Sequence, residues 1–108
     1  MATFTDYKKE LQKGVKKLSQ ALVGDFEEYA LADTNAFLKK SENDLKRWTR
    51  LLEAGEITEQ DFADLVQAKK ALAELHELTE AGIGHTKLDR FRKDLISLVI
   101  DTAMKVYI

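Results

Sequence analysis

Apolar residues recur at alternating spacings of three and four along the first part of the chain, and a similar row occupies its last twenty residues. The first row comprises Leu11, Val15, Leu18, Leu22, Phe26 and Tyr29. This spacing is the period of one helix face and predicts amphipathic helices through nearly the whole chain. With 108 residues the chain has the length of one domain. We therefore expect a single all-α domain over residues 1–108, folded as an antiparallel helical bundle.

The first predicted turn lies near residues 55–57. Gly55 can adopt the left-handed conformation that ends a helix. Thr58 can cap the following helix through its hydroxyl, and Asp61 stands at the position that completes a capping box. Two independent signals thus agree on one helix boundary.

The second predicted turn spans residues 81–85 and contains Gly82 and Gly84. Thr86 follows as a possible cap, with Asp89 in the matching position of a capping box. Short connections make neighbouring helices antiparallel. We therefore expect residues 58–80 and 86–107 to form a helical hairpin.

The first fifty residues contain no comparable stop signal. One helix of that length would reach about 75 Å, which is too long for a compact domain. The helix could be interrupted at either of two positions between residues 24 and 35. A kink at Gly24 would leave an overhanging arm, whereas a full turn at residues 32–35 would give four helices of similar length.

The position of this break decides whether the chain needs a partner. If the arm overhangs, its apolar row must bury against a second copy, as in a coiled coil. If the chain reverses, the same row becomes core and the protein could be a monomer. Gly14 lies beside this row and could permit close approach of another helix, or it could be a surface glycine tolerated at a cost of about 1 kcal/mol.

The last helix carries more apolar residues than one face requires. Phe91, Leu95 and Val99 fill one stripe, and Ile96 and Ile100 fill the strip beside it. Such a helix is either central in the bundle or keeps one face for an interface. The residues that we predict for an interface between copies are Leu11, Leu18, Leu22, Phe26, Ile96, Ile100 and Tyr107.

The charge of the chain is nearly balanced, with 17 basic and 19 acidic residues. This balance argues against nucleic acid as a partner. Five lysines between Lys8 and Lys17 form a basic stripe that could steer an acidic partner protein. In the last helix, Asp89, Asp94 and Asp101 dilute the basic residues, so contact with a membrane surface is not favoured.

Candidate chemical sites are sparse. The chain has no Cys, and no carboxylate stands three or four residues before His76, so the Glu-x-x-His pattern of di-iron bundles is missing. His85 lies in a turn, where it precedes a helix cap. An acidic cluster offers too few oxygen ligands for a cation, and its residues are Asp25, Glu27, Glu28 and Asp33. We predict no catalytic, cofactor-binding or metal-binding residues.

These observations favour a non-enzymatic module that self-associates as a dimer or tetramer and acts as an assembly or adaptor protein. One alternative is a peripheral membrane or lipid-contacting protein that uses the C-terminal amphipathic helix. Another is a small apolar-ligand binding protein with a pocket among Phe37, Trp48, Phe62 and Phe91. The chain start lacks the basic and apolar segments of a signal peptide, so we expect a cytoplasmic protein.

Overall fold

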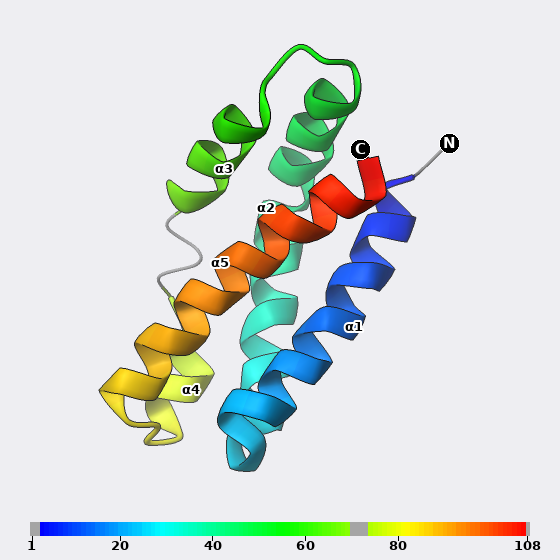
Figure 1. Ribbon diagram of the computed structural model, residues 1–108. Helices are drawn as coiled ribbons and strands as arrows, with labels where there is room; N and C mark the ends of the chain where they lie inside the picture. Colours follow the sequence, from blue (N-terminus) through cyan, green and yellow to red (C-terminus); the bar gives the residue numbers. More distant parts are fainter. Residues whose placement is uncertain (1–2, 70–73, 108) are drawn as a thin grey trace.

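The computed structural model describes residues 3–69 and 74–107, apart from the side chains of Leu22 and Val23. All its regular elements in these ranges are helical, which confirms the predicted all-α bundle (Figure 1). The elements are α1 (Phe4–Val23), the short 3-10 helix η1 (Gly24–Phe26), α2 (Glu27–Glu53), α3 (Glu59–Gln67), α4 (His76–Glu80) and α5 (His85–Tyr107).

The first fifty residues form two antiparallel helices, and the break lies at η1 (Figure 1). The expectation that a break at Gly24 leaves an overhanging arm was therefore wrong, because the chain reverses there. Residues 32–35 stay helical within α2. The Thr34 hydroxyl donates to the Ala30 carbonyl at 2.9 Å, and the Asp33 carboxylate is engaged elsewhere in the fold. These poor helix formers thus do not interrupt the helix.

The turn after α2 is confirmed in detail. Gly55 has a φ of 76°, and the Glu56 N–H donates to the Leu51 carbonyl at 2.9 Å, as in a glycine-terminated helix. The Thr58 hydroxyl accepts from the Asp61 N–H at 3.0 Å, and the Asp61 carboxylate accepts from the Thr58 N–H at 3.0 Å. The predicted capping box is therefore present at the start of α3.

The turn before α5 is present, but its predicted cap is wrong. Gly82 has a φ of 85° and ends α4. However, α5 begins at His85, and the Leu88 N–H donates to the Gly84 carbonyl at 3.0 Å. Thr86 therefore lies inside the helix, where it is not the capping residue.

The predicted helix over residues 58–80 is not continuous. It is divided into α3, which ends at Gln67, and α4, which begins at His76. Residues 70–73 lie outside the described part of the chain. The local sequence favours a longer helix, but α4 packs against α2, where Leu75 and Leu78 are buried. Tertiary packing thus overrides helix propensity here.

The core lies where α1, α2, α3 and α5 meet. α5 packs against α1, α3 and α2, which gives it the central position that its many apolar residues allow (Figure 1). Its residues Phe91, Leu95 and Val99 are fully buried, as is Tyr7 of α1. Burial raises the pKa of the Tyr7 hydroxyl, which donates to the Val99 carbonyl at 2.9 Å and ties α1 to α5.

Candidate functional site: a charged groove between α1 and α5

α1 and α5 are in tight contact at Gly14. A Cβ atom at this position would lie 2.7 Å from Leu98 Cδ1, which is closer than such atoms approach in proteins. Glycine therefore lets Leu98 sit directly against the α1 backbone. The expectation that Gly14 permits close helix approach is confirmed.

A groove follows this contact between the two helices. Its larger part has a volume of about 630 Å³, and it continues into a hollow of about 210 Å³ that shares Leu98 and Asp101 with it. The floor is largely apolar because Leu18 and Leu98, both half-buried, lie beside Gly14 and Thr102. The groove is thus an open apolar strip between two long helices.

The two sides of the groove carry opposite charges. Lys13, Lys16 and Lys17 line the α1 side, and we call them the lysine wall. Asp94 and Asp101 line the α5 side, and we call them the aspartate wall. Every one of these residues projects from a continuous helix, so the walls are held by the backbone of the bundle.

At one end of the groove the order of charge is reversed. Glu10 of α1 pairs with Lys105 of α5 at 3.5 Å and with Lys13 at 3.6 Å. In contrast, Lys16, Lys17, Asp94 and Asp101 form no ion pair with any other residue that the structure describes. Four charges therefore flank the apolar floor without a partner in that part of the chain.

The predicted interface residues are spread over the molecule. Leu18 lies in the groove, Ile96 lines a hollow of about 390 Å³ beside α3, and Tyr107 lines one of about 250 Å³ beside α2. Leu11 is fully buried in its own chain, and Ile100 is half-buried. Phe26 is half-buried beside Tyr29, and the side chain of Leu22 lies outside the described residues. Leu18 is thus the predicted residue that the structure places in the groove.

The predicted acidic cluster is divided by the fold. Asp33 is 5 % exposed, and its two carboxylate oxygens accept from the N–H groups of Glu77 and Leu78, both at 3.0 Å. It therefore caps α4 from a neighbouring helix, a role that its sequence position does not reveal. Asp25, Glu27 and Glu28 stay exposed or half-buried near the start of α2.

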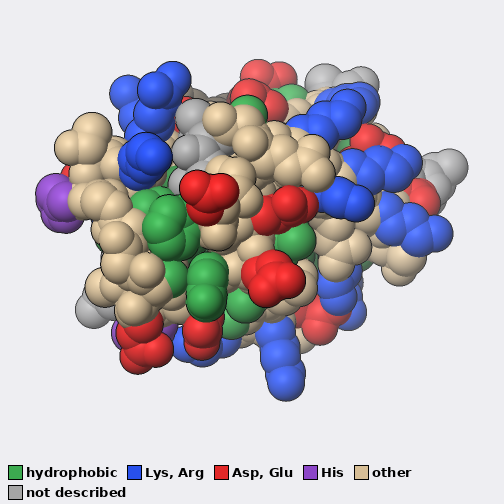
Figure 2. Space-filling model, turned by 90° about the horizontal axis from the view of Figure 1, so that it is seen from below, with side chains coloured by type: hydrophobic (Ala, Val, Ile, Leu, Met, Phe, Trp, Pro, Cys, Tyr) green, Lys and Arg blue, Asp and Glu red, His purple; other side chains and the backbone are tan. Residues whose placement is uncertain are grey.

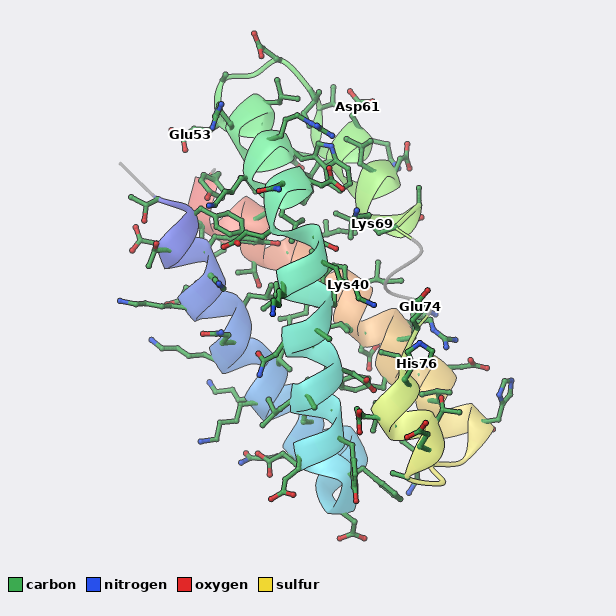
Figure 3. All side chains as sticks on the ribbon, turned by 180° about the vertical axis from the view of Figure 1, so that it is seen from behind. Lys40, Glu53, Asp61, Lys69, Glu74 and His76 are labelled. Carbon is green, nitrogen blue, oxygen red and sulfur yellow. The ribbon has the colours of Figure 1, made fainter. Side chains whose placement is uncertain are left out.

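The other candidate residues lie outside the groove. Both histidine side chains are exposed, at 74 % for His76 and 87 % for His85, and each lies near one carboxylate. His76 lies beside Glu74 (Figure 3). Among the residues that the structure describes, no group of three His, Asp or Glu side chains could hold a metal ion. The four aromatic residues of the predicted ligand pocket are buried in the core, at most 8 % exposed.

Exposed apolar surface is limited outside the groove. In the described ranges, Tyr29 is the single large apolar residue that is exposed, with an exposed fraction of 42 %. Figure 2 views the bundle from the end where α1 passes into α2, and its apolar side chains form small areas broken up by acidic ones. The basic side chains gather on the side of α1 in this view. Over the described residues, no helix is both long and apolar enough to cross a membrane.

Comparison of the chain with family models, with curated proteins and with solved structures finds no match. A functional proposal therefore rests on the geometry of the groove alone.

The basic stripe and Gly14 were recognised from the sequence, but the aspartate wall was not. The aspartates recur at helical spacing in the sequence, yet only the packing of α5 against α1 brings them beside the lysines.

Proposed function

We propose that the protein is a non-enzymatic helical module that self-associates through the α1/α5 groove and serves in assembly or as an adaptor. The observation that carries this proposal is the pair of oppositely charged walls, in which Lys16, Lys17, Asp94 and Asp101 lack ion-pair partners in the described chain. Charged groups beside an apolar strip are arranged as in the polar rim and apolar centre of a protein interface. A second copy would supply both charges at once.

The composition of the groove favours binding over catalysis. Its polar side chains are those of Lys, Asp, Glu, Gln, Ser and Thr, whereas His76 lines a different hollow with Asp33 and Glu74. Nucleophilic catalysis needs a nucleophile beside a general base that a third group orients. The groove residues instead form two parallel rows along an apolar strip, which is a geometry for contact with another helix.

The size of the face sets the strength of the association. α1 has 20 residues and is therefore about 30 Å long. Two helices side by side are about 20 Å wide, so the face covers about 600 Å² in projection. This is somewhat less than the roughly 800 Å² per partner of a standard stable interface. We therefore expect a weak, concentration-dependent dimer.

Sedimentation equilibrium of the unmodified chain tests this proposal. The mass should rise from one chain towards two as the concentration increases from about 1 µM to about 1 mM, the range in which weak interfaces dissociate. Added salt should shift the curve to higher concentration because exposed charges are screened. A mass of one chain at every concentration and at low salt would exclude self-association.

The groove also suits a helix from another protein, which is the adaptor form of the same proposal. Such a helix would need an apolar stripe with acidic residues on the edge that faces Lys16 and Lys17. The membrane and apolar-ligand alternatives lack comparable support. The apolar stripe of α5 and the four aromatic residues are both buried inside the described bundle.

A further inference from the structure

We infer that the second copy docks with a two-fold axis running along the groove, so that α1 of each copy lies over α5 of the other. This inference builds on the proposed self-association and adds the arrangement of the two copies. It follows from the order of charges along the two helices. The residues that decide it are Glu10, Lys16 and Lys17 on α1 and Asp94, Asp101 and Lys105 on α5.

Contacts within one chain establish which levels of the two helices lie opposite one another. Glu10 is level with Lys105 because the two side chains pair at 3.5 Å. Gly14 is level with Leu98, which lies directly against it. Leu18, which follows Lys17, lines a small hollow together with Asp94 and Asp101, so the lysine wall is level with the aspartate wall.

A symmetric face-to-face dimer can place these levels in two ways. A two-fold axis across the helices would put α1 on α1 and α5 on α5 with the order of levels reversed. If this axis is centred on the apolar floor at Leu18 and Leu98, which the second copy must cover, lysines meet lysines and aspartates meet aspartates. A two-fold axis along the groove puts each α1 on the α5 of the other copy at the same level. Lys16 and Lys17 then face the aspartate wall of the second copy, and like charges are kept apart.

The reversed end of the groove agrees with the same axis. There α1 carries the acid, Glu10, and α5 carries the base, Lys105. Under a two-fold axis along the groove, Glu10 also comes opposite Lys105 of the other copy. The charges of the two copies are therefore complementary at all these levels, although the sign of the charge changes along each helix.

The floor of the groove supplies the apolar centre of the interface. Leu18 and Leu98 are half-buried in one chain and line the strip along which the axis would run. A second copy would cover them with the same two residues from its own groove. The flanking charges then lie at the rim of the interface. There they select the orientation of the second copy, and added salt weakens their attraction.

Complementary charge reversals test the arrangement. One variant carries Lys16→Glu and Lys17→Glu, and the other carries Asp94→Lys and Asp101→Lys. Each variant alone should dimerise at least about tenfold more weakly than the unmodified chain because both copies of the charged contact become repulsive. An equimolar mixture should form a heterodimer, since glutamates then face lysines in one contact and the original charges meet in the other.

The matched control for the lysine variant is Lys39→Glu with Lys87→Glu, which lowers the net charge by the same amount at exposed positions that do not line the groove. Its dimerisation should differ from that of the unmodified chain by less than about threefold, and circular dichroism should show all three variants folded. If the unmodified chain dimerises but either groove variant dimerises equally well, or if the mixture forms no heterodimer, the proposed axis is wrong while self-association stands. If the unmodified chain remains a monomer, both proposals fail, and the groove is free for a helix of another protein.

Discussion

The two sides of the bundle satisfy their charges differently. On the side of α3 and α4, Lys40 pairs with Glu74 at 3.4 Å, and Lys69 forms an ion pair with Asp44 (Figure 3). The hydrogen bond from Lys69 lowers the pKa of the Asp44 carboxyl. On the side of α1 and α5, Lys16, Lys17, Asp94 and Asp101 have no such partners in the described chain.

This difference separates charges that hold the fold together from charges that are available to a partner. The short helices α3 and α4 need long-range contacts because helices of 9 and 5 residues are not stable alone. The long helices α1 and α5 are held by their buried faces, and the four unpaired charges of the groove are not needed to hold them. The first side should therefore respond to mutation in stability, and the second in association.

The largest effect on stability is expected from Asp33→Ala. This change leaves the N–H groups of Glu77 and Leu78 without their acceptor and should lower the free energy of unfolding by about 3 kcal/mol. Urea denaturation measures the loss, and Asp33→Asn, which keeps one acceptor oxygen, should lose less. A loss below about 0.5 kcal/mol would show that α4 does not depend on this cap.

A smaller effect is expected at the local cap of α3. Thr58→Ala removes the hydroxyl that accepts from the Asp61 N–H and should cost about 1 kcal/mol in the same assay. Thr86→Ala is the matched control, because Thr86 lies inside α5 and caps no helix. Equal losses for the two variants would contradict the helix boundaries described above.

A still smaller effect, of opposite sign, is expected at Ser41. Its hydroxyl is buried and has no hydrogen-bond partner among the residues that the structure describes, whereas the Thr49 hydroxyl on the same helix donates to the Leu45 carbonyl at 2.7 Å. Ser41→Ala should therefore raise the free energy of unfolding by about 0.5 kcal/mol more than Ser97→Ala, which changes an exposed helical serine. Thermal unfolding of the two variants compares them, and a net loss at Ser41 would refute this account.

The contribution of the Asp61 carboxylate to the cap of α3 should appear in the pH dependence of the free energy of unfolding. The backbone and side-chain hydrogen bonds from Thr58 lower the pKa of Asp61. The ionised carboxylate thus stabilises the fold above the ordinary pKa of about 3.9, and this stabilisation disappears as the pH falls through the lowered value. Asp61→Asn should flatten this part of the curve in unfolding measurements between about pH 5 and pH 2. An unchanged slope would contradict the contribution of Asp61.

Local features of the fold were predictable from sequence because they depend on neighbouring residues. Gly55, Thr58 and Asp61 specify one turn and cap within a few positions of one another. The reversal at η1 was not predictable, since Gly24 is compatible with both a kink and a turn. The separate start of α4 was missed because its cap is Asp33, which lies more than forty residues earlier in the chain.

The candidate site was predictable only in part. The lysines of α1 and the close approach at Gly14 follow from the sequence of one helix. The aspartate wall follows from the sequence of another, and their opposition depends on the packing of α5 between α1 and α3. Leu11, a predicted contact residue, is fully buried because the reversal at η1 closes the bundle over it.

A dilution series of amide resonances tests the division between the two sides most directly. As the concentration rises, we predict shifts at Lys16, Leu18, Leu98 and Asp101 and constant positions at Phe62 and Leu78, because a second copy would cover the groove and leave α3 and α4 untouched. Shifts centred on α3 and α4, or no shifts up to about 1 mM, where even a weak dimer forms, would contradict the account.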